Sequence, residues 1–249
     1  SARETIGRVA AGAIAEKFLK QLNISVTAYA KSIGPVEISP ERMDLSEIQN
    51  NRFCFPDAEA AKEAESYLDQ KIAECDSVGG VVECVISGLP VGLGEPVFEK
   101  LDANLAKAIL SIGAVKGFEI GDGFAATKAC GSENNDEFRM DGDKIVKETN
   151  HAGGVLGGIS DGSDVIFRAA FKPTPSIAKS QETVTKDGEN IDLVIHGRHD
   201  PVVVPRAVVV VESMAAITAM DMLLMSMTSR LDLIQMFFQV ENVDDSPEQ

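Results

Sequence analysis

The sequence has no tryptophan, only two tyrosines and few positive charges. Aromatic residues make up 5% of the 249 residues, and 23 Lys and Arg stand against 39 Asp and Glu, a formal net charge of −16. Proteins bind single-stranded nucleic acids through stacked aromatic rings and basic grooves, and membrane surfaces attract basic segments. We therefore expect neither a nucleic acid nor a membrane surface as a partner. A local cluster of Arg and Lys can still hold a small anionic substrate.

Patterns typical of zinc sites and disulfide frameworks are also missing. The four cysteines, Cys54, Cys75, Cys84 and Cys130, form no CxxC pair. No metal site is expected, and the cysteines are expected to be free thiols in a reducing compartment. The sequence does not open on an apolar leader, and charged residues interrupt the apolar stretch at 207–227. We therefore expect a cytoplasmic protein in which residues 207–227 belong to a core helix.

Hydrophobic periodicity predicts both helices and strands. Apolar residues at helical spacing predict helices from Ala2 onward and over residues 57–76, 95–112 and 206–238. Strands are expected over residues 24–30, 81–86, 115–120 and 165–171, with a hairpin pairing 182–185 with 191–195. This order favours an α+β fold over a uniformly parallel sheet. We expect a single domain over residues 1–240 and an acidic flexible tail over 241–249.

Three polar segments carry residues suited to chemistry. Residues 121–126, Gly-Asp-Gly-Phe-Ala-Ala, match a dinucleotide-binding pattern only superficially, because the loop expected at 127–135 leaves no room for the required helix. The glycines of residues 153–158 let backbone N–H groups approach a phosphate or a flat ring, and a mobile hairpin is an equally good interpretation. Residues 172–176, Lys-Pro-Thr-Pro-Ser, combine a cation and two hydroxyls with two fixed φ angles. They predict either a phosphate-binding loop or a rigid connection.

The sharpest constellation is Arg198-His199-Asp200. A guanidinium, an imidazole and a carboxylate in a row can bind an anion and move a proton. A surface turn before the next helix is the alternative. In an extended backbone, Arg198 and Asp200 point to one side and His199 to the other. His151 is better explained as a structural histidine than as a catalytic one.

Taken together, these segments closely resemble the chorismate synthase family. The resemblance is carried by residues 1–5, 9–13, 117–124, 151–159, 171–177, 198–201 and 205–207, in the family's order. It implies a β-α-β sandwich with antiparallel sheets packed on helices, of which this chain would form part, assembled as a homotetramer. The implied activity is that of a carbon–oxygen lyase. It converts 5-enolpyruvylshikimate 3-phosphate into chorismate by anti-1,4-elimination of phosphate, using reduced FMN, with NADPH as one source of flavin reduction.

The resemblance also implies site residues. The FMN-binding residues would be Ser1, Gly113, Ala114, Gly157, Lys172, Pro173, Thr174, Pro175, Ser176 and Arg198. Arg3 and Arg198 would bind the substrate, whose phosphate and two carboxylates require guanidinium groups. Asp200 would be the catalytic residue that manages a proton at the N5 edge of the flavin.

The match begins inside a family motif, so this sequence resembles the C-terminal portion of a chorismate synthase. The family's N-terminal segment supplies a general acid, and we expect this chain alone to be inactive. Two other classes remain open. A flavin-binding module would bind FMN without turnover, and a structural or interaction protein would bind no flavin at all.

Overall fold

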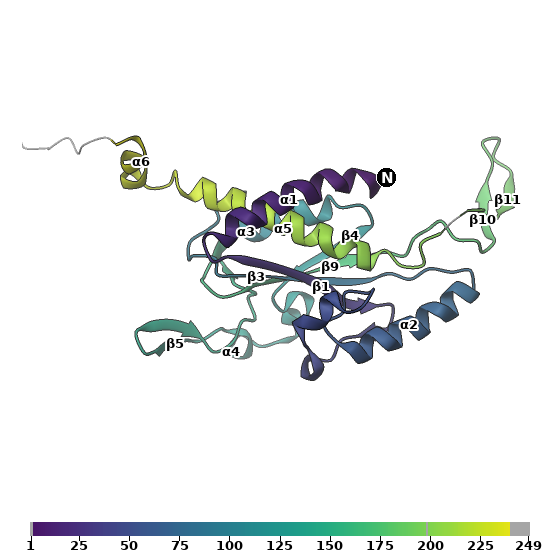
Figure 1. Cartoon of the computed structure of the whole chain (residues 1–249), viewed down its shortest axis with the longest axis horizontal. Coiled ribbons are helices and arrows are strands. Elements are labelled where there is room, and N and C mark those ends of the chain that lie inside the picture. The colour runs from purple at the N-terminus through teal and green to yellow at the C-terminus, as the bar shows by residue number, and fades with distance from the viewer. Residues whose placement is uncertain (1, 198, 240–249) are drawn as a thin grey trace, which may run out of the picture.

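A five-stranded antiparallel sheet lies at the centre of the fold (Figure 1). The computed structural model describes residues 2–197 and 199–239. The strands, in sheet order, are β2 (Val36–Glu37), β1 (Ser25–Ile33), β3 (Gly80–Ser87), β9 (Val165–Phe171) and β4 (Val115–Ile120). Each neighbouring pair is antiparallel. The strands expected at 24–30, 81–86, 115–120 and 165–171 are therefore confirmed.

Three helices cover one face of this sheet: α1 (Thr5–Lys20), α3 (Leu101–Leu110) and α5 (Val204–Ser226). Helix α5 packs on β1, β3, α1 and α3, and α3 packs on β4. The cross-strand neighbours Ala28, Cys84 and Phe167 form part of the core. The arrangement confirms the α+β class with antiparallel strands packed on helices. Within the described part of the chain, a single large sheet contacts this helical layer.

Smaller elements surround this core. Helix α2 (Ala58–Ala73) begins as expected after Asp57, whose side chain accepts hydrogen bonds from two backbone amides of the first turn. The 3-10 helices are η1 (Ala2–Glu4), η2 (Pro40–Arg42), η3 (Leu45–Gln49) and η4 (Gly123–Lys128). The remaining elements are α4 (Gly131–Asn134), α6 (Leu231–Phe238) and three hairpins: β5 (Phe138–Asp141) with β6 (Lys144–Lys147), β7 (Val155–Leu156) with β8 (Ile159–Ser160), and β10 (Gln181–Val184) with β11 (Asn190–Leu193). The last hairpin confirms the one expected from the turn at residues 186–189.

Two predicted helices are shorter than expected. The helix expected over 95–112 begins only at Leu101. Glu95 precedes a proline and so avoids the helical region, and the Leu101 N–H donates to the Gly158 carbonyl outside the helix. The helix expected over 206–238 is interrupted between Ser226 and Leu231. Thr228 and Ser229 donate side-chain hydrogen bonds to carbonyls three residues earlier, which competes with continued helix.

The segment expected as loop at 127–135 contains helical turns, η4 and α4. Strand β4 before it is antiparallel to its partner β9. A dinucleotide-binding unit needs parallel strands joined by a helix, so the structure argues against that pattern. The expected tail at 241–249 lies outside the described residues, and the single-domain boundary stays a prediction.

Helix α5 is long and apolar enough to cross a membrane by length and composition. Half of its most apolar window is buried inside the protein, where it packs against strands and two helices. We interpret α5 as the central core helix that the sequence predicted. The four cysteines are free, as expected.

Candidate flavin site

Segments far apart in the sequence meet at one end of the sheet. The Val78 N–H donates to the carbonyl oxygen of Pro201 over 2.8 Å, and Val78 and Val202 form a parallel bridge. The Lys172 N–H donates to the carbonyl oxygen of Ala114 over 3.0 Å. The segments around residues 78, 114, 172 and 201 therefore extend the sheet beyond the ends of β3, β9 and β4. Three of them hold residues predicted to bind FMN or to act in catalysis.

The turn at Gly113 and Ala114 joins α3 to β4. Ala114 has a φ of +71°, in the left-handed region that non-glycine residues rarely occupy. Arg8 of α1 fixes the turn from outside, since its guanidinium donates to Ser111 Oγ over 2.6 Å and to the Ser111 carbonyl over 3.2 Å. Among the described atoms, none lies within 4 Å of a Cβ placed on Gly113. The backbone there is open to a neighbouring flat group.

The 172–176 loop follows β9 directly. Lys172 is exposed, and the loop backbone is held from below because Ser77 Oγ donates to the Thr174 carbonyl over 2.6 Å. The loop can approach this closely because residue 79 is glycine: a Cβ there would lie 2.3 Å from the Phe171 carbonyl oxygen. The loop therefore offers a cation and hydroxyls on a backbone that is fixed at several points.

Asp200 lies beside these segments, just before Pro201, and forms an ion pair with Arg206 of α5. Arg3 belongs to η1, which leads into α1 at the same end of the helical layer (Figure 1). Ser1 and Arg198 lie outside the described residues. The structure thus brings Gly113, Ala114, the 172–176 loop and Asp200 together, with Arg3 on the adjoining helix.

Gly157 lies elsewhere. It is part of the β7–β8 hairpin, whose neighbour Gly154 packs against the Asp164 carbonyl at the start of β9. Lys172 follows the opposite end of β9, and seven strand residues span about 20 Å. Within one chain, Gly157 is therefore not brought to the other predicted FMN residues, and its role stays a prediction.

Comparisons with known proteins decide the family. The family model described as chorismate synthase matches residues 1–224. The chain belongs to the chorismate synthase family. It is 60% identical over 240 residues to the chorismate synthase of Lachnoclostridium phytofermentans and 63% identical over 239 residues to that of Agathobacter rectalis. Each match covers 96% of this chain and 65% of the relative, so the chain spans about 65% of the length of these relatives.

A solved structure agrees with this assignment. A crystal structure of a chorismate synthase superposes with a TM-score of 0.78 at 31% sequence identity. The superposition covers 96% of this chain and 68% of that one. The fold described above therefore corresponds to 68% of that chorismate synthase chain.

Cations gather at the predicted flavin end of this acidic family member. Arg3, Arg8, Lys172 and Arg206 all belong to the segments that meet there. The pKa of Asp76, just before Ser77, lies below its usual value because the Ser77 amide and Lys179 both hydrogen-bond its carboxylate. Arg8 and Arg206 are paired with Glu4 and Asp200. Among these cations, the exposed Lys172 is therefore the one placed to meet an anionic ligand, since it has no carboxylate partner on the described residues.

A second polar cluster crosses the sheet face opposite the helices. In this charged ladder, Tyr29, Glu83, Arg168 and Glu119 are aligned across four strands. The Tyr29 hydroxyl donates to Glu83 over 2.6 Å, and Arg168 binds Glu83, Glu119 and the Gly121 carbonyl. Burial and the hydrogen bond to Glu83 raise the pKa of Tyr29. Because these side chains are hydrogen-bonded to one another across neighbouring strands, the charged ladder stabilises the register of the strands.

A hollow near β4 lies away from the predicted site. It has a volume of about 480 Å³ and is lined by Glu119, Asp122, Phe124 and Arg168, at the far end of β4. His151 Nδ1 lies 2.7 Å from Asp122 Oδ2 nearby, and the structural role expected for this histidine stays a prediction. Among residues 2–197 and 199–239, no group of three or more His, Cys, Asp and Glu is arranged to hold a metal ion.

The sequence did not point to two contributors to the predicted flavin end, Arg8 and Ser77. Arg8 stands on a helix whose periodicity predicts only an exposed position. Ser77 lies in a short connection with no motif. His199 was the least certain member of its triplet, yet it contacts the 172–176 loop through Ser176. Its place in the Arg-His-Asp motif was the sequence feature that pointed to it.

Proposed function

We propose that this chain carries the flavin-binding end of a chorismate synthase. The reaction is the anti-1,4-elimination of phosphate from 5-enolpyruvylshikimate 3-phosphate to give chorismate, with reduced FMN as cofactor, in aromatic amino acid biosynthesis. One observation carries the proposal. In a chain that matches the family over residues 1–224, Gly113, Ala114, the 172–176 loop and Asp200 converge at one end of the fold.

The residues at this end suit FMN. The exposed Lys172 and the Thr174 hydroxyl suit its phosphate, and Ser176 ends the same loop. The open backbone at Gly113 suits a flat ring. Ser1 comes shortly before Arg3 in the sequence, and Arg198 comes shortly before Asp200. Both are proposed to complete the contacts with FMN.

Each residue then has a physical task. Reduced FMN, when bound, supplies electron density to the substrate as phosphate departs. Arg3 and Arg198 bind anionic groups of the substrate and orient it. Asp200, oriented by its ion pair with Arg206, accepts or returns a proton at the flavin N5 edge.

Among the residues of this chain, Asp200 alone is assigned to proton handling, and none is assigned as the acid for the departing phosphate. We expect this chain to bind flavin and to turn over slowly or not at all by itself. FMN binding without turnover, even by a full-length protein that contains these residues, would support the alternative of a flavin-binding module.

Two measurements test the proposal. FMN fluorescence titration of the 249-residue chain is expected to show saturable binding. Anaerobic chorismate formation is then compared between a full-length relative and its Asp200→Asn counterpart, with reduced FMN and 5-enolpyruvylshikimate 3-phosphate supplied. We expect the substitution to lower kcat at least about 100-fold, the typical contribution of acid–base catalysis. An unchanged kcat would exclude Asp200 from the chemistry.

The proposal also covers the oligomeric state, the cellular location and the reductant of the flavin. Ile6 and Ile14 of α1 are 73% and 70% exposed, and an apolar helical face of this kind favours association. We propose that this face of α1 packs against the rest of the sandwich and against other subunits of a homotetramer. The protein is proposed to act in the cytoplasm. NADPH is the proposed reductant of the flavin. Light scattering of the chain and of a full-length relative measures the assembly directly.

A further inference from the structure

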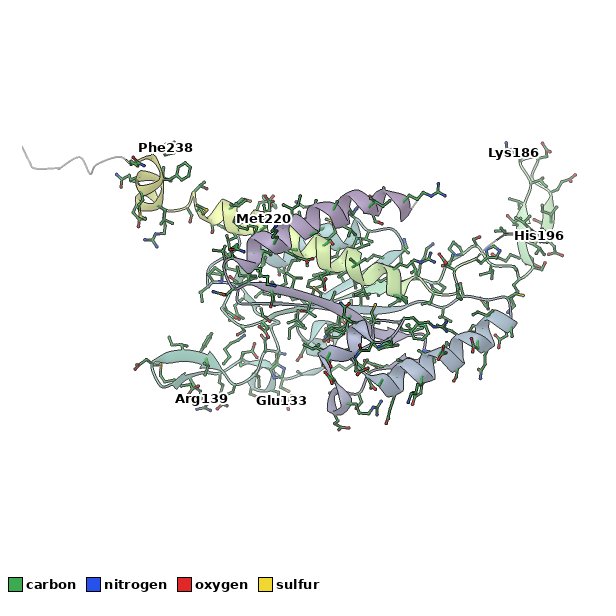
Figure 2. The ribbon with its side chains drawn as sticks, viewed as in Figure 1. Glu133, Arg139, Lys186, His196, Met220 and Phe238 are labelled. Atoms are coloured by element: carbon green, nitrogen blue, oxygen red, sulfur yellow. The ribbon has the colours of Figure 1, made fainter. Side chains whose placement is uncertain are left out.

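His199 joins the two ends of a projecting arm. Its Nδ1 lies 3.0 Å from Ser176 Oγ, and its Nε2 lies 2.9 Å from the Ile195 carbonyl oxygen. Ser176 ends the 172–176 loop and Ile195 follows β11, so the imidazole closes the base of the β10–β11 hairpin. Figures 1 and 2 show this hairpin extending away from the body, with Lys186 at its tip and His196 near its base.

The two contacts fix where the imidazole carries its proton. A carbonyl oxygen only accepts, so Nε2 must be the donor to Ile195. In the neutral ring Nδ1 then has a lone pair and accepts the Ser176 hydroxyl proton. In that form the Ser176 O–H bond points at His199, and the hydrogen bond links the end of the loop to the imidazole.

The surrounding contacts turn the carbonyl groups of the loop toward protein donors. Ser77 Oγ donates to the Thr174 carbonyl over 2.6 Å, and Gln181 Nε2 donates to the Pro175 carbonyl over 3.3 Å. Carbonyl oxygens repel an anion. With these two carbonyls occupied, the Thr174 and Ser176 N–H groups and the Lys172 ammonium are the N–H donors of the loop available to a phosphate, because the two prolines have no N–H and the Lys172 N–H already donates to Ala114. His199 lies half-buried beside a cavity of about 200 Å³ that Cys75, Asp76 and Ser77 also line.

We propose that His199 is a positioning residue for the phosphate end of the flavin: by holding Ser176 and Ile195 together, it keeps the 172–176 loop in its anion-binding shape. This inference rests on the proposed function. It assigns His199 no contact with the isoalloxazine ring and no proton transfer in the reaction.

The contrast between FMN and riboflavin isolates this role, because riboflavin lacks the phosphate. With the 249-residue chain, we expect His199→Ala to weaken FMN binding about fivefold to tenfold, the usual worth of one or two hydrogen bonds. Riboflavin affinity should not change. His196→Ala is the matched control, since this exposed histidine stands on the same arm; it should leave both affinities unchanged.

Two further variants test the route through Ser176. Ser176→Ala should reduce FMN affinity, and adding His199→Ala to it should cost little more, because coupled residues are not additive. His199→Asn keeps an acceptor for Ser176 and should retain more of the FMN preference than His199→Ala.

Three other results would contradict the role proposed for His199, and a fourth would contradict the proposed function. An equal loss for FMN and riboflavin would show a general structural role and overturn the proposal. So would additive losses in the double variant, or a His199→Ala chain that still prefers FMN as the wild type does. A wild-type chain that binds neither flavin would contradict the proposed function itself, and the inference with it.

Discussion

Arg8 and Ser111, 103 positions apart in the sequence, join the first helix to the turn before Gly113. The Arg8 guanidinium donates to Ser111 Oγ over 2.6 Å, to the Ser111 carbonyl over 3.2 Å and to Glu4 over 3.0 Å. Ser111 Oγ in turn donates to the Ala108 carbonyl at the end of α3. Through this contact the α1 helix, which follows Arg3, is tied to the backbone predicted to lie along the flavin.

Removing this tie should loosen the turn. We expect Arg8→Met to lower the free energy of unfolding by about 1–2 kcal/mol, since two hydrogen bonds to Ser111 are lost. Hydrogen exchange at residues 111–116 should rise. Urea unfolding and exchange mass spectrometry measure the two effects. Arg8→Lys, which keeps one donor, should have an intermediate effect; exchange rates equal to the wild type in Arg8→Met would show that the turn holds its shape without Arg8.

Two glycines of α1 should respond in opposite directions to the same substitution. A Cβ on Gly12 would lie 2.2 Å from Ser213 Cβ and 2.6 Å from Ser213 Cα, so Gly12→Ala must push α1 away from α5. We expect a loss of about 1–3 kcal/mol. Among the described atoms, none lies within 4 Å of a Cβ on Gly7. Gly7→Ala should therefore gain about 0.5–1 kcal/mol from helix propensity. Thermal unfolding of both variants measures the difference, and equal effects would contradict the close helix contact.

Glu212 should make stability fall as pH rises toward neutral. Its carboxylate accepts from the Ala28 N–H over 2.7 Å on the helix-covered side of the sheet. Burial first, and then the charge of Glu16, raise its pKa to about 7 from 4.5, against the Ala28 hydrogen bond. The folded protein thus holds a proton that the unfolded chain releases between about pH 4.5 and 7, and folding loses free energy over that window.

Glu212→Gln keeps an acceptor for Ala28 but cannot ionise. Relative to the wild type, it should gain about 1–3 kcal/mol between pH 5 and pH 8. Denaturant unfolding at both pH values measures this, and the difference between the two proteins cancels the other titrating groups. Burial and the charge of Glu212 raise the pKa values of Cys84 and Cys54. Both thiols therefore titrate above this window. A constant difference across the window would show that Glu212 is already ionised at pH 5.

Asp57 should act in the opposite pH direction. Its carboxylate accepts from the amides of Glu59, Ala60 and Ser39 and pairs with Arg42. Burial opposes ionisation, but these hydrogen bonds outweigh it and lower its pKa to about 2. The stabilisation is present above the unfolded value near 3.8 and is lost as pH falls through about 2.

Asp57→Asn should cost about 1–2 kcal/mol at pH 7, and the cost should shrink toward pH 2. Helical content by circular dichroism and urea unfolding measure it. The control is Asp69→Asn, on the exposed face of the same helix, which should change stability by less than about 0.5 kcal/mol. A cost for Asp57→Asn that stays the same down to pH 2 would contradict the lowered pKa.

Local patterns predicted most of the elements, because alternation, caps and turn residues act over a few positions. The strand Val165–Phe171, the helix cap at Asp57 and the hairpin around residues 186–189 are where the sequence placed them. Helix ends were less accurate. The break after Ser226 depends on hydroxyl groups that bond back to the helix, which periodicity does not register. The β5–β6 hairpin was missed although an Asp-Gly pair marks its turn.

The family, the acidic net charge and the positions of the polar and glycine-rich loops follow from the amino-acid sequence, since composition and motif order express each of them directly. The tertiary structure decided which loops meet. It set residues 113–114, 172–176 and 200 side by side through hydrogen bonds between strand ends, and it put Gly157 at the opposite end of β9. It also buried Glu212, whose pKa depends on α1 and β1 packing around it. Such contacts join residues tens to hundreds of positions apart, where no local pattern reaches.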